Sequence, residues 1–341
     1  MSDKKSTQMG DVMIRFNKIL VPTDFSKGSE SAYAAAQKIA DTFGGKVDLF
    51  HVVPTIKYWA ESAKNLGVPI DMGGDIYPKV FEEAEHKLGK IMDDYFKDDS
   101  QGECKVMIDR KPSETIANYA KKMNYDLIVI GAKGQDLTNM VRGSTTEKVI
   151  RKSKIPVFSI EGRLNEHAIK NIVMPTDGSD LSFTAFPMSV ALADTFNSKL
   201  TLLQVMELYG NSVLGNLPQP SRDEVVTVYE EVIKRLKKFL SDQGIESIHI
   251  RRSGVSFEDE VTIEDGGQSR SVSMETKVER GVSAHYEIEA YASENADLVV
   301  MATHGHSGFA HLILGSTAEK VAQYVKKPVI TVRPDKELFE K

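Results

Sequence analysis

The sequence has 341 residues, of which 41% are apolar, and this length suits two domains with separate cores. Its net charge of −6, with basic residues scattered among acidic ones, gives no basic surface for nucleic acid or an anionic membrane. A single cysteine, Cys104, excludes an internal disulfide and a thiolate metal site. No run reaches the length of a membrane span and the first residues lack the apolar core of a signal peptide, so we expect a cytoplasmic protein.

Helical patterns and short apolar runs alternate along the first part of the chain. The helical patterns cover residues 26–44 and 77–97. The apolar runs suit buried strands, and they cover residues 18–23, 46–53, 103–109, 126–132 and 156–160. Strands that alternate with helices predict parallel βαβ units.

The second part of the chain repeats the first. The segment KILVPTDFS at 18–26 returns as NIVMPTDGS at 171–179, and the segment at 142–160 returns at 314–332. The displacement between the copies grows from 153 residues at the first pair to 172 at the second. At 125–134, which returns at 296–305, the displacement is 171, so the second copy has gained 18 residues before this point. The last step, from 171 to 172, means that the first copy has lost one residue from its last loop. Such a repeat predicts two copies of one fold.

We predict an α/β protein with two repeated, doubly wound, parallel sheets of five strands each, in a Rossmann-like order. The apolar runs are continuous rather than alternating, as expected for strands that helices cover on both faces. The two domains should span residues 14–162 and 168–334, joined by a short link near 161–170.

The residues gained by the second copy predict a β-hairpin inserted at about 250–278. Apolar and polar residues alternate around Val261 and Ile263, and again around Val272 and Met274. Between them, Asp265-Gly266-Gly267 offers a tight turn. The hairpin could be a surface decoration, a dimer contact or a cover for a site, and the sequence leaves these roles open.

Two loops of each copy should meet at one edge of its sheet. In a doubly wound sheet, ligands bind at the carboxyl ends of the strands where the strand order reverses, which brings together the loops after the first and fourth strands. The first of these loops carries Asp24 or Asp177. The other has, in the second copy, the spacing Ala302-x2-Gly305-x9-Gly315-Ser316-Thr317. This spacing suits a phosphate cradle made of backbone N–H groups, or a turn without any ligand.

The motifs VPTDFS and MPTDGS, ATHGHSG, LGSTAEKV and KKPVITVRP together resemble the universal stress protein family in its tandem two-domain form. This resemblance covers nearly the whole chain and implies a fold like that of the adenine nucleotide alpha hydrolases. It also implies an adenine-nucleotide site in some members and none in others. For this chain it implies ATP as the ligand, with or without Mg²⁺, and self-association through the two halves or as a homodimer.

The resemblance implies a principal nucleotide site in the second copy. Asp177 would contact the adenosine, the backbone of Val205 would pair with adenine, and the glycine loop would surround the ribose and phosphates. The implied residues are Pro175, Asp177, Val205, Met301, Ala302, Gly305, His306, Gly315, Ser316 and Thr317.

The same positions in the first copy predict a weaker or empty site. They are Asp24, Val52, Gly131, Gly134, Gly143 and Ser144. The loop is one residue shorter, which should displace the start of the following helix relative to the loop, and Asp136 would lie where an anion must bind. Lys133 and Arg142 could offset that charge, so some binding stays open.

The same residues also bear on a metal site and on catalysis. His304, His306 and His311 form the only histidine cluster of the sequence, but neither a cysteine nor a paired carboxylate completes a metal site. The chain has no G-K-[ST] motif and the second-copy loop has no cation for phosphoryl transfer, so we expect no catalytic residues and at most slow ATP hydrolysis. A regulatory ATP-binding protein of the stress response is the favoured interpretation, and a nucleotide-free dimeric scaffold is the alternative.

Overall fold

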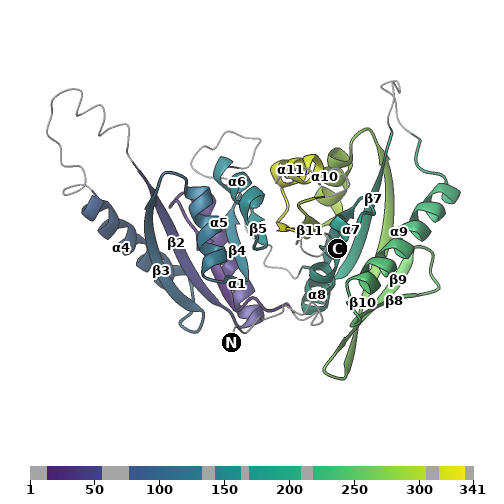
Figure 1. The fold of residues 1–341 in the computed structure, drawn as a ribbon, viewed down its shortest axis with the longest axis horizontal. Helices are drawn as coiled ribbons and strands as arrows, with labels where there is room; N and C mark the ends of the chain where they lie inside the picture. The colour runs from purple at the N-terminus through teal and green to yellow at the C-terminus, as the bar shows by residue number, and fades with distance from the viewer. Residues whose placement is uncertain are drawn as a thin grey trace, which may run out of the picture. The chain divides into compact units, whose positions relative to one another are not determined.

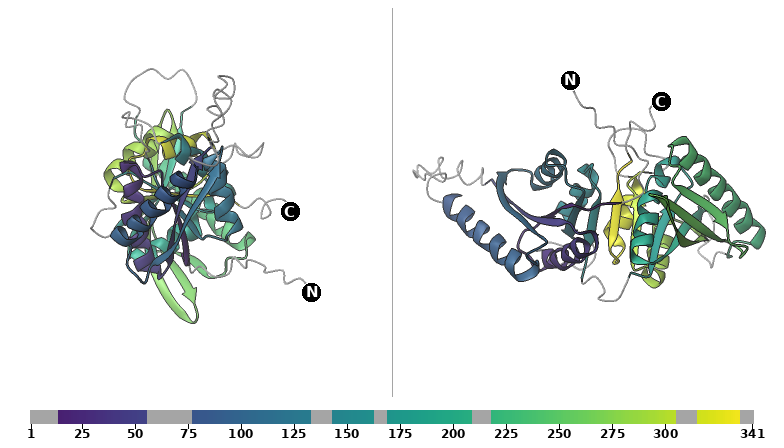
Figure 2. Two further views of the ribbon diagram at one scale, coloured as in Figure 1. Left: turned by 90° about the vertical axis from the view of Figure 1, so that its left-hand side faces the viewer. Right: turned by 90° about the horizontal axis from the view of Figure 1, so that it is seen from below.

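The computed structural model describes residues 14–55, 77–132, 143–162, 169–208, 218–304 and 315–334. The chain folds as two compact units, Arg15–Leu164 and Asn165–Lys341, which we call the first half and the second half (Figures 1 and 2). Each half is built on parallel strands with helices on both faces, and the second half adds antiparallel strands at one edge, so the doubly wound fold predicted from the repeat is confirmed.

The first half is a sheet of five parallel strands in the order β3-β2-β1-β4-β5. The strands are β1 (Lys18–Pro22), β2 (Lys46–Pro54), β3 (Gln101–Asp109), β4 (Leu127–Gly131) and β5 (Val157–Ile160). The helices are α1 (Lys27–Phe43), α4 (Tyr77–Tyr95), α5 (Pro112–Lys122) and α6 (Ser144–Lys152). Helix α1 packs against α4 and α5 against α6, and because the crossovers are right-handed the two pairs cover opposite faces.

The second half is a sheet of seven strands in the order β12-β11-β6-β7-β10-β9-β8. The strands are β6 (Asn171–Thr176), β7 (Lys199–Glu207), β8 (Ile248–Arg252), β9 (Glu258–Asp265), β10 (Gln268–Gly281), β11 (Leu298–Ala302) and β12 (Val329–Val332). The helices are α7 (Asp180–Phe183), α8 (Phe186–Phe196), α9 (Arg222–Asp242), α10 (Ala284–Asn295) and α11 (Ser316–Tyr324). Helices α8 and α9 contact β10 from one side, while α10 packs with α11.

The inserted hairpin is present, and the prediction of a five-stranded parallel sheet with a hairpin insertion is confirmed for the second half. Strands β9 and β10 pair antiparallel around the turn Gly266-Gly267. The remainder of β10, from Met274 to Gly281, pairs parallel with β7 as the fifth strand of the repeated fold. Strand β8 then adds to the outer edge of β9. The insertion therefore lengthens an existing edge strand and widens the sheet.

Helix α9 is hydrogen-bonded to the added strands, β8 and β9, through a buried carboxylate of β9. The Tyr229 hydroxyl lies 3.0 Å from both carboxylate oxygens of Asp259, a β9 residue that is only 2% exposed. The Phe257 ring packs edge-on against Tyr229, and Phe257 adopts a left-handed φ of 64°. The guanidinium of Arg252 lies 5.6 Å from the centre of the Tyr229 ring. Burial raises the pKa of Asp259, because desolvation outweighs the hydrogen bond from Tyr229.

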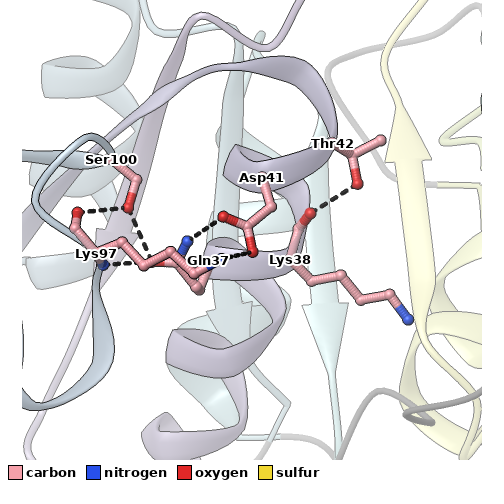
Figure 3. Close-up of polar contacts among 6 residues, drawn as sticks. All are labelled: Gln37, Lys38, Asp41, Thr42, Lys97 and Ser100. Carbon is pink, nitrogen blue, oxygen red and sulfur yellow. Dashed lines mark hydrogen bonds and ion pairs between the residues drawn. The ribbon is translucent and has the colours of Figure 1, made fainter.

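A polar cluster fixes α1 to the turn between α4 and β3 in the first half (Figure 3). The Gln37 side-chain oxygen accepts hydrogen bonds from the Lys97 N–H at 2.9 Å and from the Ser100 hydroxyl at 2.8 Å. The Gln37 amide nitrogen donates to Asp41 at 2.7 Å, and Asp41 also pairs with the Lys97 ammonium at 2.8 Å. Gln37 thus satisfies a backbone donor that the turn leaves without a partner.

Candidate functional site

The strand order places the two predicted loops of each half at one edge of its sheet. In the first half β1 and β4 are neighbours, and in the second half β6 and β11 are neighbours. The turns that follow β1 and β6 therefore lie beside the carboxyl ends of β4 and β11. This edge is the point at which the strand order reverses, as the sequence predicts for a ligand site.

The turns after β1 and β6 have the same internal hydrogen bonds. In the second half, the Thr176 hydroxyl accepts from the Gly178 N–H at 3.0 Å, and Asp177 accepts from the Ser179 N–H at 3.0 Å. In the first half the corresponding bonds, made by Thr23 and Asp24, are 2.9 and 3.0 Å long. The residue after the aspartate has a left-handed φ in both turns, 74° at Gly178 and 62° at Phe25.

Each turn holds its aspartate in a fixed position at the surface. Asp177 accepts a 2.6 Å hydrogen bond from the Ser179 hydroxyl, and Asp24 accepts one of the same length from Ser29. Partial burial opposes ionisation of Asp24, but hydrogen bonds from Ser26 and Ser29 outweigh it, so the pKa of Asp24 lies below its ordinary value. A carboxylate of this kind is an acceptor for hydroxyl or amine donors and a weak proton acceptor.

The helices α6 and α11 begin at the same position relative to their sheets. The Gly143 N–H donates to the Ala132 carbonyl at 2.7 Å, and the Gly315 N–H donates to the equivalent Thr303 carbonyl at 2.9 Å. The two N-cap glycines have φ near −59° and −58° and ψ near 139° and 140°. The start of α6 relative to β4 therefore matches the start of α11 relative to β11. The loops between them, residues 133–142 and 305–314, lie outside the described residues, so the displacement of the helix start relative to the loop stays a prediction.

Neither helix start has a side-chain cap, which suits an anion. Glycine at the N-cap leaves the first N–H groups of α6 and α11 without a side-chain acceptor. Ser144 and Ser316 are exposed there, and Thr317 is partly exposed. Within the described residues these N–H groups have no side-chain acceptor, and together with the helix dipole they favour a negatively charged ligand group.

Gly131 has a packing role that the sequence did not indicate. A Cβ atom at this position would lie 2.2 Å from the Gly28 carbonyl oxygen of α1, so any side chain would collide with the helix backbone. The Thr146 hydroxyl also donates to the Gly131 carbonyl at 2.8 Å. In the second half Ala302 occupies the same position with its methyl group buried. The glycine is thus explained by helix packing without a nucleotide.

Pro175, Val205 and Met301 lie in the buried ends of β6, β7 and β11. The side chains of Val205 and Val52 are largely buried, so only their backbone groups could meet a base. Gln204, the neighbour of Val205, is a residue at this edge that the sequence did not indicate. Its side-chain oxygen lies 3.9 Å from the position that a Cβ atom would take on Gly178. The equivalent His51 ring bonds the Thr23 carbonyl at 2.8 Å. The displacement of 153 residues between the two copies relates His51 to Gln204, so the sequence alone could have indicated that they are equivalent.

Several predicted residues lie outside the described part of the chain. They are Lys133, Gly134, Asp136, Arg142, Gly305, His306 and His311. His304 is described, and its Nδ1 lies 2.8 Å from the Thr303 hydroxyl, which orients the ring at the end of β11. Within the described residues no cluster of three potential metal ligands occurs. Likewise, none of the helices there has the length and apolar character to cross a bilayer.

Comparison with known proteins identifies the family. The model of the universal stress protein family matches residues 15–160 and 168–333. A universal stress protein of Mycolicibacterium smegmatis is 23% identical over 324 residues, which cover 93% of this chain and 97% of the relative. One from Methanocaldococcus jannaschii is 28% identical over 179 residues, or 51% of this chain and 88% of the relative. The crystal structure of a universal stress protein from Archaeoglobus fulgidus superposes with a TM-score of 0.58 at 20% identity, covering 96% of this chain and all of that one. The chain therefore belongs to the universal stress protein family.

Proposed function

We propose that this protein binds ATP in its second half and acts as a regulatory protein of the stress response. The observation that carries the proposal is the pairing of two features at one sheet edge. The Asp177 turn offers a fixed carboxylate for the hydroxyls of a nucleoside, and the uncapped start of α11 offers N–H groups for its phosphates. The Asp177 turn follows β6 and the start of α11 follows the connection from β11, and these two strands are neighbours in the sheet.

The described residues fit a nucleotide by backbone and hydroxyl groups. The N–H groups at Ser316 and Thr317 would hold phosphate oxygens, and their hydroxyls would add donors. Asp177 already accepts hydrogen bonds from Ser179, which keeps its carboxylate in place before a ligand arrives. We propose binding without dedicated turnover, because phosphoryl transfer needs a cationic group at the terminal phosphate and the sequence of the loop at 305–314 contains no lysine or arginine.

We propose unequal occupancy of the two halves, although their turns and helix starts match. The difference would come from the loops between the fourth strand and the following helix, residues 133–142 and 305–314. The first of these is one residue shorter and carries Asp136, whose charge would repel a polyphosphate. Self-association, bound Mg²⁺ and a cytoplasmic location remain predictions.

Native mass spectrometry of the purified full chain tests this proposal, with nucleotide extraction as the readout. Asp177→Ala should lower bound ATP by about tenfold, the loss expected when charge-assisted hydrogen bonds disappear. Asp24→Ala is the matched control from the first half and should leave the ATP content close to that of the wild type. Gly305→Val should likewise lower the bound ATP, because a branched side chain would obstruct the phosphates. Gly134→Val, in the first half, should leave the bound ATP unchanged.

Three outcomes would contradict the proposal in different ways. Loss of ATP in Asp24→Ala and Gly134→Val alone would assign the site to the first half. A wild-type chain without nucleotide that also fails to bind added ATP would favour the scaffold alternative. Steady conversion of ATP at the ~1 to 10³ s⁻¹ of ordinary enzymes would replace a binding protein by a catalyst.

A further inference from the structure

Strand β3 forms one edge of the first-half sheet (Figure 1). Within the described residues it pairs only with β2, and its residues 102–105 are exposed. Helix α4 packs on β3 but leaves these four residues uncovered. An open edge presents main-chain N–H and C=O groups that a further strand can bind. The first half therefore offers a place for a strand beside β3.

The second half shows which kind of strand this edge accepts. There β10 takes the place of β3, and Thr276 corresponds to Cys104, because the two residues face equivalent leucines of β7 and β2. Strand β9 lies antiparallel along the outer edge of β10, and the Thr276 N–H donates to the Phe257 carbonyl at 2.9 Å. The fold thus accepts an antiparallel strand at this edge, and the main chain of Cys104 should face it.

Hydrogen bonds to β2 establish which main-chain groups of β3 face outward. The Glu103 N–H donates to the Asp48 carboxylate at 2.6 Å, so Glu103 faces inward. The Asp109 carbonyl accepts from the Thr55 N–H at 3.3 Å, so Asp109 also faces inward. Main-chain direction alternates along a strand, and the even-numbered residues of 104–108 therefore face the open edge. In an antiparallel pair these residues would make the hydrogen bonds.

The charges of β3 are complementary to those of a second β3 in one register. If two copies pair antiparallel about Cys104, Glu103 of each copy lies opposite Lys105 of the other. A centre one residue away would place Glu103 opposite Glu103, or Lys105 opposite Lys105, and like charges in direct opposition destabilise a pair. A centre at residue 106 would place Glu103 opposite Asp109. Charge therefore favours the register centred on Cys104.

The side chains of Glu103 and Lys105 lie on the side of the sheet where α5 packs. Burial raises the pKa of Tyr119 on α5, and the nearby carboxylates of Asp48 and Glu103 raise it further. Lys105 is two residues from Glu103 and so shares its side. The Asp48 carboxylate already lies 4.0 Å from the Lys18 ammonium. Among the described residues no ion pair involves Glu103 or Lys105, so a second copy can pair with both.

The α4 side of the sheet carries one charge that opposes the pairing. Burial raises the pKa of Cys104, and the carboxylates of Asp48 and Asp93 raise it further, which places the thiol near Asp93 of α4. The two-fold axis of an antiparallel pair is perpendicular to the sheet and brings like faces side by side. Two Asp93 carboxylates would then share one face. They belong to helices above the sheet and are not directly opposite, unlike Glu103 and Lys105.

The outer edge of the second half does not suit the same pairing. There β8 is the outermost strand, and its exposed side chains are His249, Arg251 and Arg252. Two antiparallel copies of β8 would bring positive charges together. The charge pattern therefore favours β3 over β8 as the contact between two copies.

We propose that β3 pairs antiparallel with β3 of a second copy of this chain, with the two-fold axis at Cys104. The exposed main chain would supply the hydrogen bonds, as in other cases where a strand adds to a sheet edge. The two Glu103–Lys105 contacts would set the register. The sheets of two first halves would become continuous. This contact is separate from the nucleotide site, so its test does not depend on bound ATP.

Sedimentation equilibrium of the full chain measures the dissociation constant of the dimer. Glu103→Lys and Lys105→Glu each turn two attractive pairs into two repulsive ones, so each should raise this constant at least about tenfold. The double variant Glu103→Lys/Lys105→Glu restores opposite charges and should dimerise like the wild type. Glu246→Lys reverses the same charge at an exposed position before β8 and should change nothing. Circular dichroism checks that each variant is folded.

The position of the axis is tested with Cys104, the single cysteine of the chain. Hydrogen-bonded residues in direct opposition on antiparallel strands have Cα atoms about 5.5 Å apart. A short bismaleimide, which adds one thiol across each of its two C=C bonds, should therefore join two wild-type chains. Glu103→Lys should yield much less of the linked dimer, and the double variant should regain it. Denaturing gel electrophoresis measures the product.

Several results would overturn the proposal. A wild-type chain that stays monomeric at every concentration would remove the dimer, and a dimer that neither reversal weakens would use another surface. Opposite effects of Glu103→Lys and Lys105→Glu would mean that β3 pairs with a different strand. A double variant as weak as the single ones would show that the two side chains are not opposite each other. A dimer that the bismaleimide does not link would place the axis away from Cys104.

Discussion

The first crossover helix differs between the two halves, although the turn that precedes it is the same. Helix α1 runs unbroken for 17 residues, whereas its counterpart is divided into α7 and α8. Pro187 stands where α1 has Ala34, and proline removes a backbone donor and crowds the carbonyl four residues earlier. The break therefore falls just before Phe186, and proline becomes an early residue of α8, where it is tolerated.

The two halves also differ in how closely the first crossover helix approaches its sheet. In the first half the Gly28 backbone of α1 lies so close to β4 that residue 131 must be glycine. In the second half, where Leu181 and Ala302 occupy these positions, a methyl group fits. The pair teaches that a glycine in a family motif can serve packing in one copy of a repeat and be dispensable in the other.

The largest effect should follow from a side chain at the close helix contact. Gly131→Val places Cβ within collision distance of the Gly28 carbonyl, and we expect a loss of about 3 kcal/mol in the stability of the first half. Ala302→Gly is the matched change in the second half and should cost only about 1 kcal/mol. Denaturant unfolding followed by circular dichroism measures both. Equal costs would show that the two contacts do not differ.

A smaller effect should follow from loss of the Thr146 hydroxyl. This buried group donates to the Gly131 carbonyl at 2.8 Å, and the second half has Ala318 at the same position. Thr146→Val should destabilise the first half by about 1–2 kcal/mol, because a buried acceptor loses its donor. Thr145→Val, at the exposed neighbouring position, is the control in the same unfolding measurement. If the two variants unfold alike, the hydroxyl contributes nothing to the contact.

The extension peculiar to the second half should become more stable when its buried carboxylate is removed. The folded-state pKa of Asp259 is raised, so its contribution to stability is present at low pH and is lost as the pH rises through that value. Asp259→Asn keeps an acceptor for Tyr229 and removes the charge. At pH 7 we expect a midpoint a few degrees higher than that of the wild type, with the gain shrinking toward pH 4.

Calorimetry across this pH range checks the sign for Asp259. Glu260→Gln, at the exposed neighbour on β9, serves as the control and should not shift the midpoint with pH. A lower midpoint for Asp259→Asn at pH 7 would mean that ionised Asp259 stabilises the extension through Arg252 and Lys237, whose charges favour its ionised form.

The smallest effect concerns the cluster that fixes α1 in the first half. Gln37→Ala removes the acceptor of the Lys97 N–H and the Ser100 hydroxyl and should cost about 1 kcal/mol. Lys97→Ala removes only an exposed ion pair with Asp41, and we expect no measurable change in thermal midpoint. A larger loss for Lys97→Ala than for Gln37→Ala would reverse the assignment of the key contact.

Sequence reasoning predicted most of the fold correctly because its signals are local and repeated. Strands such as 126–132 are continuous apolar runs, the pattern that parallel strands covered on both faces require, and the structure has β4 there. The turn Gly266-Gly267 between alternating runs predicted the hairpin for an equally local reason. The reversal of strand order predicted the edge of the sheet at which the candidate site lies.

The sequence by itself determined the duplication, the doubly wound class and the edge where the aspartate turns and helix starts meet, since periodicity and turn residues act within a few positions of the chain. Tertiary structure decided what depends on distant contacts. It paired the hairpin strand β10 with β7, because β10 is long enough to pair with β9 along its first part and with β7 along its last part. It also fixed the start of α6 despite the missing residue, because the Gly143–Ala132 hydrogen bond spans the loop. Such contacts link residues whose separation in sequence carries no pattern, so only the folded chain specifies them.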